Sequence, residues 1–220
     1  MAMPELKLDT LPRFGFLLAA MLAELTLGPL IVMGTNSITI VRVIAGVVLI
    51  AALMVAGSRR FPVILFVAAL VSHVLSSFSP RTDLAAVSEM ARLVFLCYVM
   101  LVLVRRVMRQ RVITFDTVAG AACAYMLIGW VWGELFTLVE RWRPGSFVIP
   151  SSWVTGPGSD LRAALMYFSF ATLTTLGYGD IHPSTPASGV LCTGEALIGQ
   201  LYLAIMIARM VGLQISQRNA

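Results

Sequence analysis

The sequence predicts an all-α membrane protein with six transmembrane helices. Of its 220 residues, 59% are hydrophobic and 12% are charged, whereas soluble domains carry about 25% charged residues. Six apolar stretches approach or exceed the roughly 20 residues that an α-helix needs to cross a bilayer. They comprise residues 14–33, 38–57, 61–78, 85–104, 113–139 and 186–214. A bilayer, rather than a single soluble core, is therefore expected to cover this apolar surface.

The basic residues predict the orientation of the six spans. The net charge is +5, but the lysines and arginines cluster between apolar runs, so we expect contact with lipid and not with nucleic acid. Ten of them fall on one side of the predicted membrane, namely Lys7, Arg13, Arg59, Arg60, Arg105, Arg106, Arg109, Arg111, Arg209 and Arg218. Five fall on the other side, namely Arg42, Arg81, Arg141, Arg143 and Arg162. The excess predicts a multi-pass protein of the cell (inner) membrane with both termini in the cytoplasm.

The first half of the chain is predicted to hold a peripheral membrane domain. Residues 1–13 form a cytoplasmic N-terminus, and residues 14–104 form four spans. Residues 105–112 form an interfacial linker in which arginines alternate with apolar residues. This linker is either a short helix lying among the lipid headgroups or an ordinary stop-transfer cluster.

The segment Thr174–Asp180, with the sequence TTLGYGD, is predicted to bind a cation. It follows an apolar run at residues 161–174 that is too short to cross a bilayer. A cation in a narrow pore exchanges its hydration water for oxygen ligands, and backbone carbonyls provide them. Directing successive carbonyls to one side of the chain requires left-handed backbone, which Gly177 and Gly179 accept. Thr175 can add a hydroxyl oxygen, and Tyr178 can pack outward to hold the diameter of the ring.

These residues closely resemble the signature of the potassium-channel family, over roughly residues 113–213. The resemblance implies that residues 113–214 form a pore domain with an outer helix, a re-entrant pore helix, an extended selectivity-filter loop and an inner helix. K⁺ would be bound by Thr175, Leu176, Gly177 and Tyr178, with Gly179 completing the filter. The supporting residues would be Thr174, Asp180 and Tyr167. Because one chain supplies one filter strand and a carbonyl ring takes four, a homotetramer is expected.

The sequence departs from the family pattern at three places. Leu176 stands where Val or Ile is most frequent, and Tyr167-Phe168 replace a frequent Trp pair, which leaves fewer indole donors near Asp180. Ala171 stands where one subclass has a buried Glu. Filter inactivation therefore cannot be inferred from the behaviour of that subclass.

The last predicted span contains the residues expected to form the hinge and the cavity of the pore. Gly199 lies twenty residues beyond Gly179, the spacing of a hinge glycine in similar channels, although a small residue also allows close helix packing. The same resemblance places Gln200, Leu203 and Ile207 along the cavity below the filter, with Val211 narrowing its cytoplasmic end. Residues 215–220 would form a short cytoplasmic tail.

Several ionisable residues lie inside the predicted spans. Glu195 is expected to contact the pore helix, either as a structural brace or as a pH-sensitive element. Five others are expected to form ion pairs or hydrogen bonds with one another inside the four-helix domain. These five are Glu24, Arg42, His73, Glu89 and Arg92.

The function predicted from these features is passive, selective K⁺ conduction. The sequence lacks the nucleophile-elbow, P-loop and paired-cysteine motifs of enzymes, so no enzyme activity is expected, and no cofactor other than the permeant K⁺. The sequence identifies no cytoplasmic regulatory partner. The alternatives are a weakly selective cation channel, a membrane subunit of a potassium transporter and a non-conducting modulatory subunit.

Overall fold

The computed structural model describes residues 13–35, 46–54, 60–78, 82–154 and 160–218. Most of these residues are helical, and a two-stranded antiparallel sheet is the one sheet found among them. The helices are α1 (Arg13–Thr35), α3 (Arg60–Phe78), α4 (Thr82–Arg109), α5 (Phe115–Trp142), α6 (Ser151–Val154), α7 (Leu161–Leu173) and α8 (Pro186–Arg218). Residues 46–54 are also helical. The strands are β1 (Phe147–Val148) and β2 (His182–Pro183).

The helices coincide with the apolar runs of the sequence. Two of the described helices, α5 and α8, are long and apolar enough to cross a membrane. The helices α1, α3 and α4 cover the first, third and fourth predicted spans, and the helical residues 46–54 cover part of the second. The helical fold is therefore as predicted, and crossing by these four segments stays a prediction.

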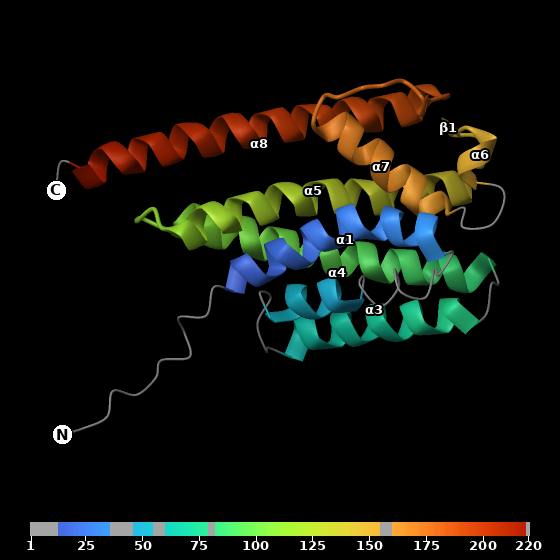
Figure 1. Ribbon diagram of the computed structural model, residues 1–220, viewed down its shortest axis with the longest axis horizontal. Helices are drawn as coiled ribbons and strands as arrows, with labels where there is room; N and C mark the ends of the chain where they lie inside the picture. The colour runs from blue at the N-terminus through green and yellow to red at the C-terminus, as the bar shows by residue number, and fades with distance from the viewer. Residues whose placement is uncertain (1–12, 36–45, 55–59, 79–81, 155–159, 219–220) are drawn as a thin grey trace.

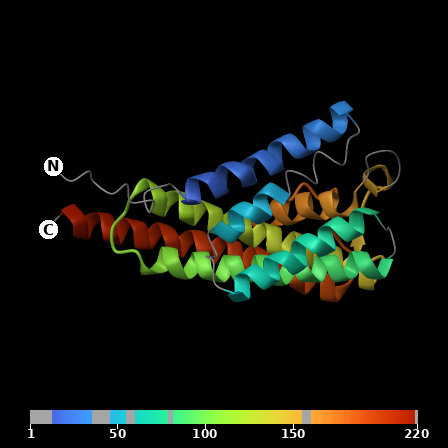
Figure 2. The same cartoon turned by 90° about the horizontal axis from the view of Figure 1, so that it is seen from below.

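Helix α5 occupies the centre of the fold. It packs against α1 and α4 on one side and against α7 and α8 on the other, while α3 packs against α4 (Figure 1). The N-terminal end of α1 and the C-terminal end of α8 lie at one end of the molecule, and α7 lies towards the other (Figures 1 and 2). This arrangement is consistent with an even number of crossings.

Two local features of α5 explain its start and its close contact with α7. Thr114 caps the helix, because its side chain accepts the amide of Thr117 while the Thr117 side chain accepts the amide of Thr114. Gly129 and Gly133 face α7, where a Cβ on Gly133 would lie 3.1 Å from the Met166 Cα and one on Gly129 would lie 2.9 Å from the Phe170 ring. Small residues four positions apart thus bring the two backbones together.

The predicted linker at residues 105–112 begins inside a helix. Helix α4 continues without a break through Arg105 and Arg106 to Arg109, so these arginines form the last turns of α4 and not a separate interfacial helix. Basic side chains suit this position because they face the partially negative C-terminal end of a helix.

The charged residues of the first four spans whose side chains are described form their ion pairs with the second half of the chain, although Glu89 and Arg92 also attract each other within α4. Glu24 lies 4.0 Å from Arg162 of α7, Glu89 lies 2.6 Å from Arg141 of α5, and Arg92 lies 3.3 Å from Glu134 of α5. Arg42 and His73 lie outside the described side chains. Glu89 and Arg92 find their partners on α5, which packs against α4, whereas Glu24 of α1 reaches Arg162 on α7.

We predict that Gly133→Val destabilises the fold by about 1–3 kcal/mol, the usual cost of overpacking a tight contact. The added methyl groups must push Met166 and the α7 backbone away from α5. The measurement is the free energy of unfolding in detergent, followed by tryptophan fluorescence. Gly46→Val is the matched control, because a Cβ there meets no atom within 4 Å, and it should change stability by less than about 0.5 kcal/mol. Equal effects of the two substitutions would contradict the packing assignment.

Candidate functional site

Helix α7 leads directly into the candidate site. It begins at Leu161 and is capped by Asp160, whose side chain accepts the amide of Arg162 at 3.0 Å. It ends at Leu173, and Thr174 forms its C-terminal cap. The segment from Thr174 to Asp180 then runs in non-helical conformation towards β2. The apolar run predicted as a short helix is therefore a helix, and the glycine-containing segment directly follows it.

The backbone of this segment alternates in hand. Thr175, Gly177 and Gly179 have φ values of 59°, 57° and 80°, whereas Leu176 and Tyr178 are not among the residues with positive φ. The left-handed region costs glycine nothing but is strained for a β-branched residue such as Thr175, at about 1–3 kcal/mol. Alternation of this kind is what lets successive carbonyl groups face the same side of the strand, as the sequence predicts for Gly177 and Gly179.

The first amides of the segment turn back onto α7. The amides of Leu176 and Gly177 donate to the Ala171 carbonyl at 2.9 and 3.2 Å, and the Thr175 amide donates to Thr172 at 3.0 Å. The Thr174 hydroxyl donates to the Phe170 carbonyl at 2.6 Å. These bonds satisfy carbonyls that the end of a helix would otherwise leave without donors, and they hold the strained segment in place.

Tyr167 and Asp180 meet at the far end of the segment. The Tyr167 hydroxyl donates to Asp180 Oδ2 at 2.8 Å, and Asp180 Oδ1 accepts the Ile181 amide at 2.9 Å. The ring of Trp153, from α6, lies 4.9 Å from that of Tyr167. Two of the three residues expected to support the segment, Tyr167 and Asp180, are thus in direct contact.

A small sheet fixes the chain beyond Asp180. Strand β2 pairs with β1, with Phe147 opposite Pro183 and Val148 opposite His182. The Glu140 carboxylate holds the turn before β1, since it accepts the amides of Gly145 and Phe147 at 2.7 and 3.0 Å. The end of α5 and the exit of the glycine segment are therefore joined.

Glu195 of α8 reaches the middle of α7. The Ser169 hydroxyl lies 2.8 Å from the Gly129 carbonyl of α5 and 2.5 Å from Glu195 Oε1. Because Ser169 has one hydroxyl proton, both contacts are hydrogen bonds only when the Glu195 carboxyl is protonated and donates to Ser169. This fully buried acid contacts the helix that the sequence predicts for it.

Helix α8 contacts α7 through Gly199. A Cβ on Gly199 would lie 2.6 Å from Leu173 Cδ1 and 3.0 Å from the Leu173 carbonyl oxygen, so close packing by itself explains a glycine here. Lower on α8, the Tyr202 hydroxyl donates to the Ala121 carbonyl of α5 at 2.8 Å. Arg209 donates to the Met108 carbonyl at 2.9 Å, which joins the end of α8 to the end of α4.

The predicted cavity-lining residues of α8 lie mainly on uncovered surface. Gln200, Ile207 and Val211 are exposed in the single chain, and Leu203 is half-buried. Leu176 and Tyr178, predicted to belong to the filter, are also exposed. One chain therefore places Tyr167, Asp180 and Glu195 around α7 and the segment that follows it, but does not enclose the predicted cavity.

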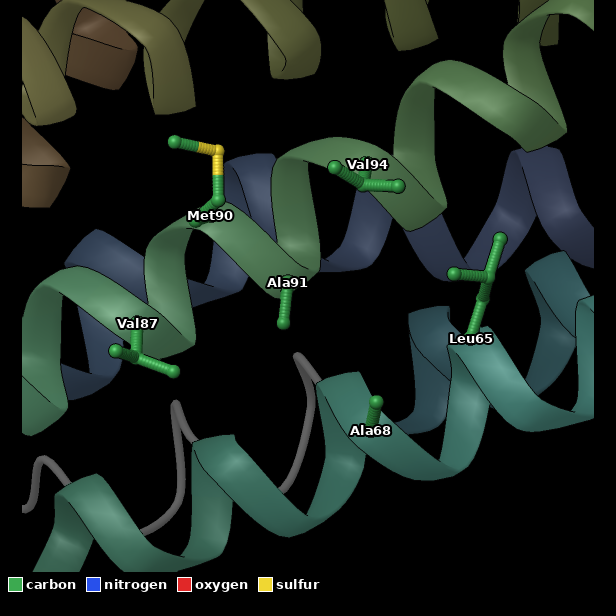
Figure 3. A pocket seen from close by; sticks show the side chains of 6 residues that line it. All are labelled: Leu65, Ala68, Val87, Met90, Ala91 and Val94. Carbon is green, nitrogen blue, oxygen red and sulfur yellow. The ribbon is translucent and has the colours of Figure 1, made fainter.

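A groove between α3 and α4 lies apart from this site. It has a volume of about 350 Å³ (Figure 3). It is lined by Leu65, Ala68, Val87, Met90, Ala91 and Val94. None of these side chains is polar, so the groove offers no ligand for a cation.

Sequence reasoning missed three features of the site. Glu134 is fully buried beside α7, and its signal was an acid within the apolar run at residues 113–139. Gly129 and Gly133 form a small-xxx-small pattern that marks close helix packing. The positive φ of Thr175 has no signal in the residue type, because a β-branched residue normally avoids that region.

Comparison with known proteins places the similarity at this site. The family model described as "Ion channel" matches residues 152–213. The chain is 40% identical over 68 residues to two pore potassium channel c of Oryza sativa subsp. japonica, a match covering 31% of this chain and 14% of that protein. It is 32% identical over 77 residues to human potassium channel subfamily K member 16, covering 30% of this chain and 25% of that protein. No solved structure matches.

The matched part is the one that carries α7, the glycine segment and most of α8. The chain covers only a quarter or less of the length of these two relatives. The domain match and both relatives point to a channel rather than an enzyme. Part of this chain is therefore similar to ion channels and to two potassium channels, and two of the described helices are apolar enough to span a membrane.

Proposed function

We propose that four copies of this chain form a K⁺-selective channel that conducts K⁺ passively down its electrochemical gradient. The carbonyl oxygens of Thr175, Leu176, Gly177 and Tyr178 replace the hydration shell of the ion, with Gly179 completing the strand. Thr174, Tyr167 and Asp180 hold this filter. The channel is a multi-pass protein of the cell membrane with both termini in the cytoplasm.

The alternating backbone of the glycine segment is the observation that carries this proposal. Left-handed φ values at every second residue from Thr175 to Gly179 suit a strand whose carbonyls line one side. The C-terminal end of α7, with its partially negative potential, lies at the base of the same strand, which favours a cation there. Non-helical backbone at membrane depth is tolerated where it lines such a pore.

The uncovered apolar surface supports assembly of several copies. Leu176 and Tyr178 are 53% and 71% exposed in one chain, although a filter strand needs packing around it to keep its shape. Along α8, large apolar residues are exposed at Val190, Leu197, Ile198, Leu201, Ile205, Ile207, Val211 and Ile215. A fourfold ring would cover the filter and one face of α8, leaving Gln200, Leu203 and Ile207 towards the central cavity. Val211 would then narrow the cytoplasmic end, and bending near Gly199 would open it.

The purified protein in a planar bilayer, with K⁺ on one side and Na⁺ on the other, tests the proposal. The reversal potential should lie close to the K⁺ equilibrium potential. A value near zero with measurable current would favour a weakly selective cation channel, and absence of current would favour a transporter or modulatory subunit.

We predict that Gly177→Ala abolishes K⁺ selectivity or conduction while the protein still assembles. A Cβ at Gly177 meets no atom within 4 Å, but φ is +57°, so the damage comes from a backbone that alanine disfavours. The measurement is the reversal potential of the assembled variant. Gly46→Ala, with open space and ordinary backbone, is the control and should behave as the wild type. A selective Gly177→Ala tetramer would remove the basis of the filter assignment.

We predict that a tag at residue 1 and a tag near Gly145 report opposite sides of the membrane, the first cytoplasmic and the second extracellular. The ten-to-five excess of basic residues on one side sets this orientation. Accessibility of each tag to a membrane-impermeant reagent, in intact and in permeabilised cells, is the measurement. Two tags on the same side contradict an even number of spans with this polarity.

We predict that opening depends only weakly on voltage. Within the apolar part of α4, Arg92 is the one basic residue, and it is held by Glu134. One mobile charge gains about 2.3 kcal/mol per 100 mV, and steep sensors move 3–4 charges in each subunit. Open probability should therefore vary with a shallow slope between about −150 and +150 mV, a range in which even one charge responds. A slope as steep as that of a twelve-charge sensor would show that Arg105, Arg106 and Arg109 enter the field.

A further inference from the structure

A buried network of four charged residues joins four helices. Glu134 of α5 is completely buried, and its Oε1 lies 2.6 Å from Nε of Arg162, the second residue of α7. The same carboxylate faces Arg92 of α4, with Nε 3.3 Å from Oε1 and Nη2 3.4 Å from Oε2. Glu24 of α1 lies 4.0 Å from the other side of the Arg162 guanidinium. Two acids and two bases balance, so the network carries no net charge.

Burying this network costs free energy, so a role beyond simple packing is expected for it. Removing a charged group from water costs several kcal/mol, and good geometry is needed to recover it. Burial by itself lowers the pKa of Arg162, yet the carboxylates of Glu134 and Glu24 raise it overall. Apolar residues at these positions would satisfy the packing without that cost, so the charges are best explained by the specific position they impose.

The element whose position these charges fix is the N-terminal end of α7, through Arg162. The rest of α7 is held to α5 by single neutral hydrogen bonds, from Ser169 to the Gly129 carbonyl at 2.8 Å and from Tyr125 to the Leu173 carbonyl at 3.1 Å. The contact between Arg162 and Glu134 is the charge-assisted one, and such bonds are roughly twice as strong. A shift of α7 at this end is passed to its other end, where the Ala171 and Thr172 carbonyls hold the amides of Thr175, Leu176 and Gly177.

We propose that Glu134 and Arg162 are positioning residues of the ion filter, which fix α7 and through it the spacing of the filter carbonyls. This inference rests on the proposed K⁺ conduction, since it concerns the same filter. Arg92 and Glu24 complete the network and make the position of α7 depend on the peripheral helices α4 and α1. The peripheral domain thereby acts on the filter through α7, by a route separate from the contact between Arg209 and the end of α4.

The test compares Glu134→Gln/Arg162→Gln with the wild type in planar bilayers. Removing both charges leaves Arg92 and Glu24, which are opposite in sign and attract each other through space, whereas either single substitution would leave a net charge in the buried network. The K⁺/Na⁺ permeability ratio should fall by about 2- to 30-fold, the size of couplings between distant residues. Tetramer yield from detergent is measured in parallel.

Arg162→Lys provides a second variant that keeps the charge and favours folding. Lysine lacks the planar guanidinium whose Nε lies 2.6 Å from Glu134, so the permeability ratio should fall in the same direction by a smaller factor.

The matched control is Glu89→Gln/Arg141→Gln. That pair is also 2.6 Å long but joins α4 to α5, with neither residue on α7. Glu89 acts on Arg92 and Glu134 only through space, so the permeability ratio should fall by a clearly smaller factor than in the Glu134→Gln/Arg162→Gln variant. An equal fall in the control, or unchanged ratios in both α7 variants, overturns the inference. A wild-type protein without K⁺ selectivity instead overturns the proposed function, so the two failures are distinguishable.

Discussion

Helix α7 ends inside the protein, and the carbonyls of its last turn must find donors that no further helical residue supplies. The amides of Thr175, Leu176 and Gly177 provide them. This constraint forces the following segment to fold back tightly against the helix end, and the positive φ of Thr175 is part of that turn. The glycines that follow continue the alternation at little cost. The end of α7 and the segment that follows it are consequently one hydrogen-bonded unit, so whatever positions α7 also positions the segment proposed to bind K⁺.

The rest of the fold is arranged around that unit. Helix α5 approaches α7 through Gly129 and Gly133, and α8 approaches it through Gly199. These glycines bring the backbones of the three helices into close contact, and such close packing restricts sliding of one helix along another. Glu195 and Ser169 add a polar contact at the middle of α7, while Tyr167 and Asp180 close the outer end. Charged pairs from α1 and α4 then extend the same scaffold into the first half of the chain.

Much of this was predictable from residue pattern. Apart from the run at residues 38–57, whose ends lie outside the described residues, the apolar runs predicted the helices to within about five residues, because helix length and hydrophobicity are local properties. The spacing of Gly177 and Gly179 predicted the left-handed positions, and the match of residues 152–213 to an ion-channel family falls on the same segment. Glu195 was expected to contact the short helix, and it lies 2.5 Å from Ser169. The linker boundary at residue 105 was not predictable, since Arg105, Arg106 and Arg109 suit both a helix end and an interfacial segment.

The sequence by itself predicted a helical membrane protein and the left-handed glycines of the segment Thr174–Asp180, because apolar run length and glycine spacing act within a short stretch of chain. The partners of the buried charges were decided by tertiary structure alone. Glu24, Glu89 and Arg92 pair with residues 138, 52 and 42 positions away, and nothing in the local pattern distinguishes these partners from nearer ones. The choice follows from which helices pack together, and the close approach of α5 to α1, α4 and α7 fixes it. A buried charge must pair with an opposite charge within reach, and only the packed helices decide which one that is.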